Sequence, residues 1–137
     1  MIVADTNVVS EMMKAQPNAA LAHWAEDRPS STIYTTAITV AEIRYGIERL
    51  PGGKRRSALA AAADAVLSQF GDRVLPFDGH AADEFGRIMA ERQRAGKPIG
   101  AFDAQIAAIA RSHGATLATR NVRDFDGCGV ELVNPWG

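Results

Sequence analysis

The sequence has little of several residues on which other protein classes depend. Cys128 is the only cysteine among 137 residues, so the chain can form no internal disulfide and no cysteine-based zinc site. His23, His80 and His113 are far apart in the sequence and show no metal-ligand spacing. Aromatic residues make up 7% of the chain, which is too few for a continuous base-stacking surface. These absences exclude disulfide-stapled and zinc-binding scaffolds.

An excess of charge and long apolar runs are also missing. The formal net charge is −1, which excludes a protein that holds nucleic acid by bulk charge alone and leaves only a local basic patch. No window approaches the roughly 18 apolar residues that span a bilayer, and no signal peptide pattern opens the chain. Glycine-rich nucleotide-binding loops are absent, so no nucleotide cofactor is expected. We expect a soluble, cytoplasmic protein that does not contact membranes.

Length and hydrophobic periodicity predict one α/β domain over residues 1–137. The hydrophobic content of 47% is that of an ordinary globular core. Apolar, β-branched runs predict strands at 2–4, 32–36, 74–77, 115–119 and 130–133. Helical stripes between these runs predict helices at 8–13, from 18, and at 38–50, 54–70, 80–95 and 102–113. Strands that alternate with helices indicate βαβ units and a mostly parallel sheet covered by helices.

Acidic and amide side chains follow the predicted strands. Asp5 closes the first strand, Glu42 lies in the helix after the second, and Asp103 starts a later helix. Asn121 and Asp124 follow the strand that ends at residue 119. Working sites of parallel α/β sheets lie outside the carboxyl ends of the strands, so these five side chains are the candidate catalytic residues.

Each of these residues taken alone has a structural explanation. Asp5 and Asp103 are good helix N-caps or first-turn acids, Glu42 can be a solvated surface acid, and Asn121 and Asp124 suit a turn. Taken together, clustered carboxylates repel one another unless a cation neutralises them. Oxygen ligands without histidine or cysteine suit Mg²⁺, with Mn²⁺ as a substitute. A carboxylate-held Mg²⁺ is a common device for phosphodiester hydrolysis.

Four short motifs in order resemble the PIN domain, and with the chain ending they resemble VapC-type toxins in particular. The motifs are Asp5-Thr6-Asn7, Thr39-Val40-Ala41-Glu42, Phe102-Asp103-Ala104 and Thr119-Arg120-Asn121 with Asp124-Phe125, and the ending is Asn134-Pro135-Trp136. The resemblance extends from residue 2 to residue 136. It implies a three-layer α/β/α fold with four to five strands and a Mg²⁺-dependent endoribonuclease. It also implies a homodimer that is inhibited by a cognate antitoxin.

By that resemblance, Asp5, Glu42 and Asp103 match the acidic metal site of the family. The family's fourth acidic position falls on Asn121, a neutral amide, and Asp124 is the alternative source of the missing charge. Two hydroxyl positions beside the site also match, with supporting roles: Thr6 and Thr119. Counting charges predicts one tightly held ion, chiefly on Asp5 and Asp103, and a weak second ion unless Asp124 reaches the cluster.

Basic residues near these motifs are candidates to position an RNA strand: Arg44, Lys54, Arg55, Arg56 and Arg120. The cluster at residues 54–56 is better explained as a solvated helix start, and Trp136 is expected to be a packing anchor rather than a base-stacking platform. The resemblance further implies that an antitoxin peptide lies along the helix at 38–50 and offers a cation to the carboxylates.

Two other function classes remain open. An aspartyl-phosphate phosphatase or receiver domain would use Asp5 as its nucleophile, but Asn7 replaces the second acid of such sites and no lysine follows Thr119. A catalytically silent protein-binding module of the same fold is the other alternative. A metal titration separates it from a nuclease, because a silent module shows no metal-linked stabilisation.

Overall fold

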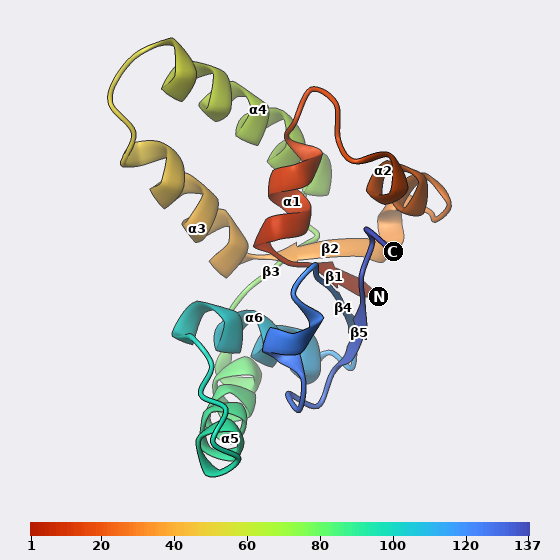
Figure 1. Ribbon diagram of the computed structural model, residues 1–137, viewed down its shortest axis with the longest axis vertical. Coiled ribbons are helices and arrows are strands. Elements are labelled where there is room, and N and C mark those ends of the chain that lie inside the picture. The colour runs from red at the N-terminus through yellow and green to blue at the C-terminus, as the bar shows by residue number, and fades with distance from the viewer.

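The computed structural model describes residues 1–137 as a five-stranded sheet between two layers of helices (Figure 1). The strands are β1 (Ile2–Ala4), β2 (Ile33–Thr36), β3 (Val74–Leu75), β4 (Thr116–Ala118) and β5 (Glu131–Val133). Their spatial order is β3-β2-β1-β4-β5, and every neighbouring pair is parallel. The expected three-layer α/β/α architecture with a parallel sheet is confirmed.

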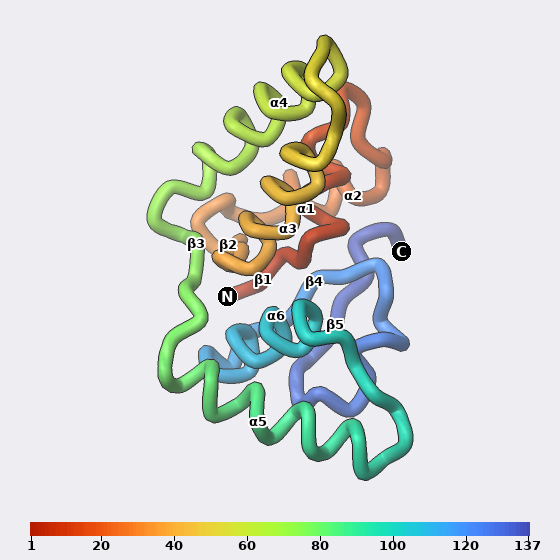
Figure 2. The backbone as a smooth tube through the Cα atoms, turned by 90° about the vertical axis from the view of Figure 1, so that its left-hand side faces the viewer, coloured from red at the N-terminus to blue at the C-terminus, as the bar shows by residue number.

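Helices cover both faces of the sheet. They are α1 (Thr6–Met12), α2 (Ala19–Glu26), α3 (Ala37–Glu48), α4 (Lys54–Phe70), α5 (Gly79–Arg94) and α6 (Ala101–Ser112), with short 3₁₀ helices η1 (Ser30–Thr32) and η2 (Val122–Phe125). The first four α-helices lie on one side of the sheet and the last two on the other (Figure 2). None of the helices is long and apolar enough to cross a membrane.

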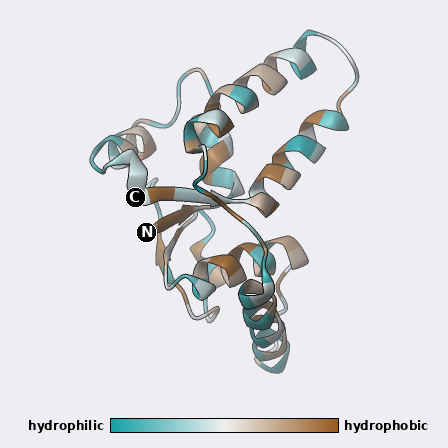
Figure 3. Cartoon of the chain, turned by 180° about the vertical axis from the view of Figure 1, so that it is seen from behind, coloured by the Kyte–Doolittle hydropathy of each residue, from teal (hydrophilic) through white to brown (hydrophobic).

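Side chains of the central strands alternate between two hydrophobic cores. Val3 and Leu117 pack against α5 and α6, whereas Ala4 and Ala118 pack against α1, α3 and α4. This alternation follows from the period of two along a strand. The first strand is hydrophobic along its length, while α5 is largely hydrophilic (Figure 3). Burial on both faces holds the sheet rigid beneath its carboxyl edge.

Local signals in the sequence set most helix ends. The side chains of Asp5 and Thr36 accept hydrogen bonds from backbone N–H groups of the helices that they cap, α1 and α3. Gly71 ends α4 with φ +56° and Gly114 follows α6 with φ +61°, in the left-handed region that glycine tolerates.

Three short segments differ from the pattern-based prediction. Thr32 belongs to η1 rather than to β2, because its backbone N–H and its hydroxyl both bond to the carbonyl of Pro29. β3 ends at Leu75, and Pro76 beyond it has no N–H for a sheet ladder. The η2 helix was not foreseen, since its polar residues suited a simple turn.

Candidate active site

The carboxyl ends of three neighbouring strands bring the predicted residues to one edge of the sheet. β1 pairs in parallel with both β2 and β4, so the chain leaves all three strands at the same edge. Asp5 follows β1, Thr36 ends β2, and Thr119 follows β4. The starts of α1 and α3 therefore lie side by side there (Figure 1).

Asp5 is the most buried acid at this edge, with 4% of its surface exposed. Its Oδ1 accepts the N–H of Val8 at 3.0 Å, so the expectation that it caps a helix is confirmed. Burial raises the pKa of Asp5 to about 6, although hydrogen bonds from the Thr119 hydroxyl and from backbone N–H groups oppose the rise. The charge of Asp103 adds to the increase. Asp5 is thus both a cap and a carboxyl group short of positive partners.

Glu42 is held by a hydroxyl of the neighbouring helix. It lies in the second turn of α3, half-buried, and its Oε1 accepts a hydrogen bond of 2.8 Å from the Thr6 hydroxyl. The fully buried Thr39 hydroxyl lies 3.4 Å from that of Thr6 and 3.2 Å from that of Thr36. Glu42 is therefore oriented toward the start of α1 and is not a freely solvated surface acid.

Asp103 is the acid that couples the others. It lies in the first turn of α6, half-buried. Burial is the main cause of its raised pKa, followed by the charges of Glu42 and Asp124. Because Asp103 also raises the pKa of Asp5, all four carboxylates belong to one electrostatic cluster.

Asn121 and Asp124 contribute differently to this edge. Both are exposed and belong to the η2 segment. The backbone N–H of Asn121 donates to the Thr119 hydroxyl oxygen at 3.0 Å, which places Asn121 two hydrogen bonds from Asp5. The Asp124 charge reaches Asp103. The Asp124 carboxylate therefore adds a fourth negative charge to the electrostatic cluster.

The donor set fits a hard divalent cation. No lysine, arginine or histidine of the chain forms an ion pair with any of the four carboxylates, although seven such pairs exist elsewhere. The carboxylates and hydroxyls at this edge are oxygen ligands, which suit Mg²⁺ or Mn²⁺. As the side chains stand, no three acids gather closely enough to form a ready-made metal cage.

Comparison with known families agrees with this arrangement. The family model of the PIN domain matches residues 2–127, which include all the candidate site residues. The chain belongs to the PIN domain family. It is 43% identical to VapC ribonuclease Y4jK of Sinorhizobium fredii, covering 99% of this chain and 98% of that protein. It is 39% identical to Toxin FitB of Neisseria gonorrhoeae (99% of each chain) and 32% identical to the tRNA(fMet)-specific endonuclease VapC of Shigella flexneri (96% and 95%).

Solved structures of VapC-type PIN domains superpose closely on this chain. The structure of FitAB bound to a DNA fragment matches with a TM-score of 0.91 and 38% identity, covering 100% of this chain and 96% of the other. VapBC-5 of Mycobacterium tuberculosis, a member of the VapBC family of toxin–antitoxin systems, matches with a TM-score of 0.72 and 27% identity, covering 96% of each chain.

A buried arginine of this PIN domain was not singled out from the sequence. Arg92 on α5 is 6% exposed and has no carboxylate partner. Its guanidinium donates to the backbone carbonyls of Lys97 at 2.6 Å, Asp124 at 2.8 Å and Asp126 at 2.9 Å. Arg92 thereby ties η2, and with it Asp124, to α5. Nothing in its sequence neighbourhood indicates burial, because two of its three carbonyl partners lie more than 30 residues away in the chain.

Most of the predicted RNA-positioning cations lie away from the carboxylates. Residues 54–56 begin α4 at the end of the α3–α4 hairpin remote from the sheet (Figure 1). Arg56 pairs with Glu48 at 2.5 Å, and Arg44 pairs with Asp64 at 2.8 Å. The solvated-helix-start explanation fits residues 54–56 better. Arg120, beside Thr119, is the cation that stays at the site edge.

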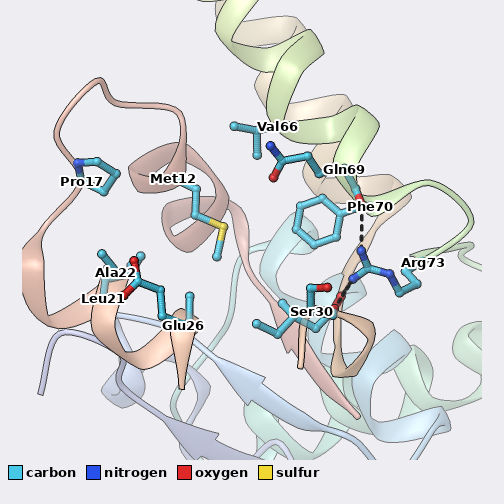
Figure 4. A pocket seen from close by; sticks show the side chains of 12 residues that line it. Met12, Pro17, Leu21, Ala22, Glu26, Ser30, Val66, Gln69, Phe70 and Arg73 are labelled. Carbon is cyan, nitrogen blue, oxygen red and sulfur yellow. Dashed lines mark hydrogen bonds between the residues drawn. The ribbon is translucent and has the colours of Figure 1, made fainter. Parts of the chain in front are cut away.

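An apolar hollow of the molecule is separate from the carboxylate cluster. It measures about 610 Å³ and lies between α1, α2 and α4 (Figure 4). Its wall is mostly apolar and includes Met12, Leu21 and Phe70, while Arg73 at its rim donates to the carbonyls of Ser30 and Gln69. Glu26 is its only acid, so it offers no second acidic site.

Proposed function

We propose that this PIN-domain protein is a divalent-metal-dependent endoribonuclease and the toxin of a toxin–antitoxin pair. The observation that carries the proposal is the cluster of four carboxylates at the carboxyl edge of the sheet, none of which has a basic partner within the chain. A partly buried cluster of this kind is unfavourable by itself and is suited to a cation that also binds phosphate. The names of its VapC relatives support the same activity.

Asp5, Asp103 and Glu42 are the residues that would hold Mg²⁺ or Mn²⁺, and Asp124 would add charge from η2. The ion, when bound, polarises the scissile phosphate and lowers the pKa of an attacking water. Thr6 and Thr119 orient two of these carboxylates, since their hydroxyls bond to Glu42 and Asp5. Thr6 donates to Glu42 Oε1, so Oε2 is the oxygen of Glu42 that would face the ion or accept a hydrogen bond from the attacking water.

Cleavage of total RNA tests the nuclease proposal. The purified chain is incubated with total cellular RNA in Mg²⁺ or in EDTA, and new 5′ ends are mapped. Transfer RNA is inspected first, because one relative is named as a tRNA-specific endonuclease. We expect discrete cuts with Mg²⁺, none with EDTA and none with Asp103→Asn. Asp83→Asn, which removes an exposed acid of α5, is the matched control and keeps full activity. Equal cutting by Asp103→Asn and the unmodified chain would refute the proposal.

The toxin proposal also involves a protein partner. Because the carboxylates lack partners of their own, a lysine or arginine of an antitoxin can pair with them and exclude the metal. We propose that this antitoxin peptide approaches along α3, which carries Glu42. The homodimer that the resemblance implies stays part of this proposal.

Growth and co-purification experiments test the toxin proposal separately. Expression of the chain is expected to slow growth, and co-expression of the product of the neighbouring reading frame is expected to restore it. The two products are expected to co-purify, and light scattering of the isolated chain measures its oligomeric state. Normal growth without any bound partner would refute the toxin role while leaving the nuclease test unaffected.

A further inference from the structure

A polar hollow of about 480 Å³ adjoins the carboxylate cluster and is not part of the proposed metal site. It is lined by Asn7, Ser10, Glu11, Lys14, Arg120, Asn121 and Trp136. Six of these seven residues are polar or charged, in contrast to the apolar hollow beside α2. A hollow of this composition suits a charged, hydrated ligand rather than a hydrophobic one.

Two of the lining residues connect the hollow to Asp5. The backbone N–H of Asn7 bonds to the Asp5 carboxylate. The backbone N–H of Asn121 donates to the Thr119 hydroxyl, which bonds to the same carboxylate. The hollow therefore begins two residues from Asp5 and two residues from Thr119, so a strand that leaves the scissile position on this side would enter it.

The charge of the hollow is positive where the neighbouring cluster is negative. Lys14 is exposed and pairs with Glu11 at 2.9 Å, while Arg120 has no carboxylate partner in the chain. The guanidinium of Arg120 instead lies 5.2 Å from the centre of the Trp136 ring. Two cations against one acid leave a charge of +1. The Trp136 ring holds the guanidinium in place without neutralising it.

We propose that this hollow is an RNA subsite in which Lys14 and Arg120 bind the phosphate of the nucleotide next to the scissile bond. The Asn7 and Asn121 side chains line the same space and offer amide donors and acceptors to the ribose or base. This subsite rests on the proposed nuclease function. It also gives Trp136 a second task besides packing against the core, since its ring fixes the direction of Arg120.

Salt-dependent binding of a single-stranded RNA tests the subsite without any cleavage. The probe is a fluorescein-labelled oligouridylate in EDTA, and its affinity is followed by anisotropy across a range of salt concentrations. Arg120→Ala and Lys14→Ala are each expected to weaken binding roughly tenfold at low salt and to reduce the slope of log K against log salt by about 0.7. Arg120→Lys is expected to restore the slope, because it restores the charge.

Arg55→Ala is the matched control, because it removes an exposed arginine at the far end of the α3–α4 hairpin. The control is expected to bind like the unmodified chain. An equal loss with Arg55→Ala would show binding by general charge and would overturn the subsite. Unchanged affinity in both pocket variants, as expected if the hollow takes an acidic peptide, would overturn it too. Cleavage of total RNA is measured in a separate experiment. If the unmodified chain cleaves RNA but its Lys14 and Arg120 variants bind the probe normally, the subsite is refuted and the nuclease proposal stands.

Discussion

Among the residues of the site, Asp5 makes the largest unfavourable contribution to the stability of the folded chain at neutral pH. Its pKa of about 6, against 3.8 in an unfolded chain, means that the folded chain binds a proton there more tightly. The stability that depends on Asp5 is therefore full below about pH 4 and is lost as the pH rises through about 6. At neutral pH the difference amounts to about 3 kcal/mol. A bound cation removes this cost by stabilising the ionised form.

Asp5→Asn is expected to stabilise the metal-free chain while abolishing RNA cleavage. Asparagine keeps an oxygen for the N–H of Val8, so the cap of α1 is preserved. In EDTA, the free energy of unfolding should rise by up to about 3 kcal/mol above pH 6 and should not rise below pH 4. Urea denaturation at several pH values measures this, with Asp83→Asn as the control. A gain that is independent of pH would contradict the assigned cause.

The Asp124 carboxylate adds charge to the negative cluster, whereas the Asn121 side chain is a neutral amide. Three carboxylates alone carry −3 and leave little attraction for a second divalent ion, whereas the Asp124 charge reaches Asp103 and brings the sum to −4. The sequence left this choice open, because the spacing within η2 does not show which side chain faces the site.

Asp124→Asn is expected to weaken Mn²⁺ binding about tenfold, and Asn121→Asp is expected to strengthen binding of a second ion. Isothermal calorimetry measures both changes. The control is Asp126→Asn, which removes an exposed acid just past η2 that does not raise the pKa of Asp103. Equal losses in the Asp124 and Asp126 variants would show that only general charge matters.

At the scale of elements, α5 supports the site from behind. No residue of α5 belongs to the carboxylate cluster, yet Arg92 fixes the η2 backbone through the carbonyls of Asp124 and Asp126. The same guanidinium also binds the carbonyl of Lys97, in the connection to α6. Arg92 thus ties together two segments: the connection that precedes Asp103 and the η2 helix that contains Asp124.

Arg92→Met is expected to lower the free energy of unfolding by about 2–4 kcal/mol, because three carbonyls lose a charged donor. It should also weaken Mn²⁺ binding, since η2 then holds Asp124 less firmly. Arg87→Met on the same helix removes an exposed arginine paired with Glu84 and should change stability by less than about 1 kcal/mol. A destabilised Arg92 variant with unchanged Mn²⁺ affinity would limit Arg92 to a structural role.

At the scale of the whole molecule, the two hydrophobic cores stabilise the edge of the sheet, whereas the carboxylates at that edge repel one another. The acids come from the N-cap of α1 and from α3, α6 and η2, and the three α-helices belong to both helical layers. An ion bound by acids from both layers would link them, so we expect metal binding and global stability to be coupled.

Mg²⁺ or Mn²⁺ is expected to raise the melting temperature of the unmodified chain by several degrees. An ion at 100 times its Kd contributes about 2.7 kcal/mol to the folded state. The double variant Asp5→Asn, Asp103→Asn should show no such increase. Calorimetric scans with and without the metal measure both. An unmodified chain that gains nothing would support the silent binding module over the nuclease.

The sequence by itself determined the α/β class, the strand order along the chain and the identity of the acidic residues. These features depend on local properties: hydrophobic period, capping residues and the position of polar groups after strands. Asp5 as the cap of α1 and Gly71 as the end of α4 were readable for that reason. The parallel sheet followed from the alternation of strands and helices.

Only the tertiary structure decided which of those residues act on one another. The Thr6–Glu42 hydrogen bond, the reach of Asp124 to Asp103 and the Arg92 contacts with η2 join residues that are distant in the chain. Local propensity carries no information about such pairs, because their distances are set by how helices pack on the sheet. The same packing placed residues 54–56 at the far end of the α3–α4 hairpin and Arg120 in the hollow that Glu11 and Asn121 also line.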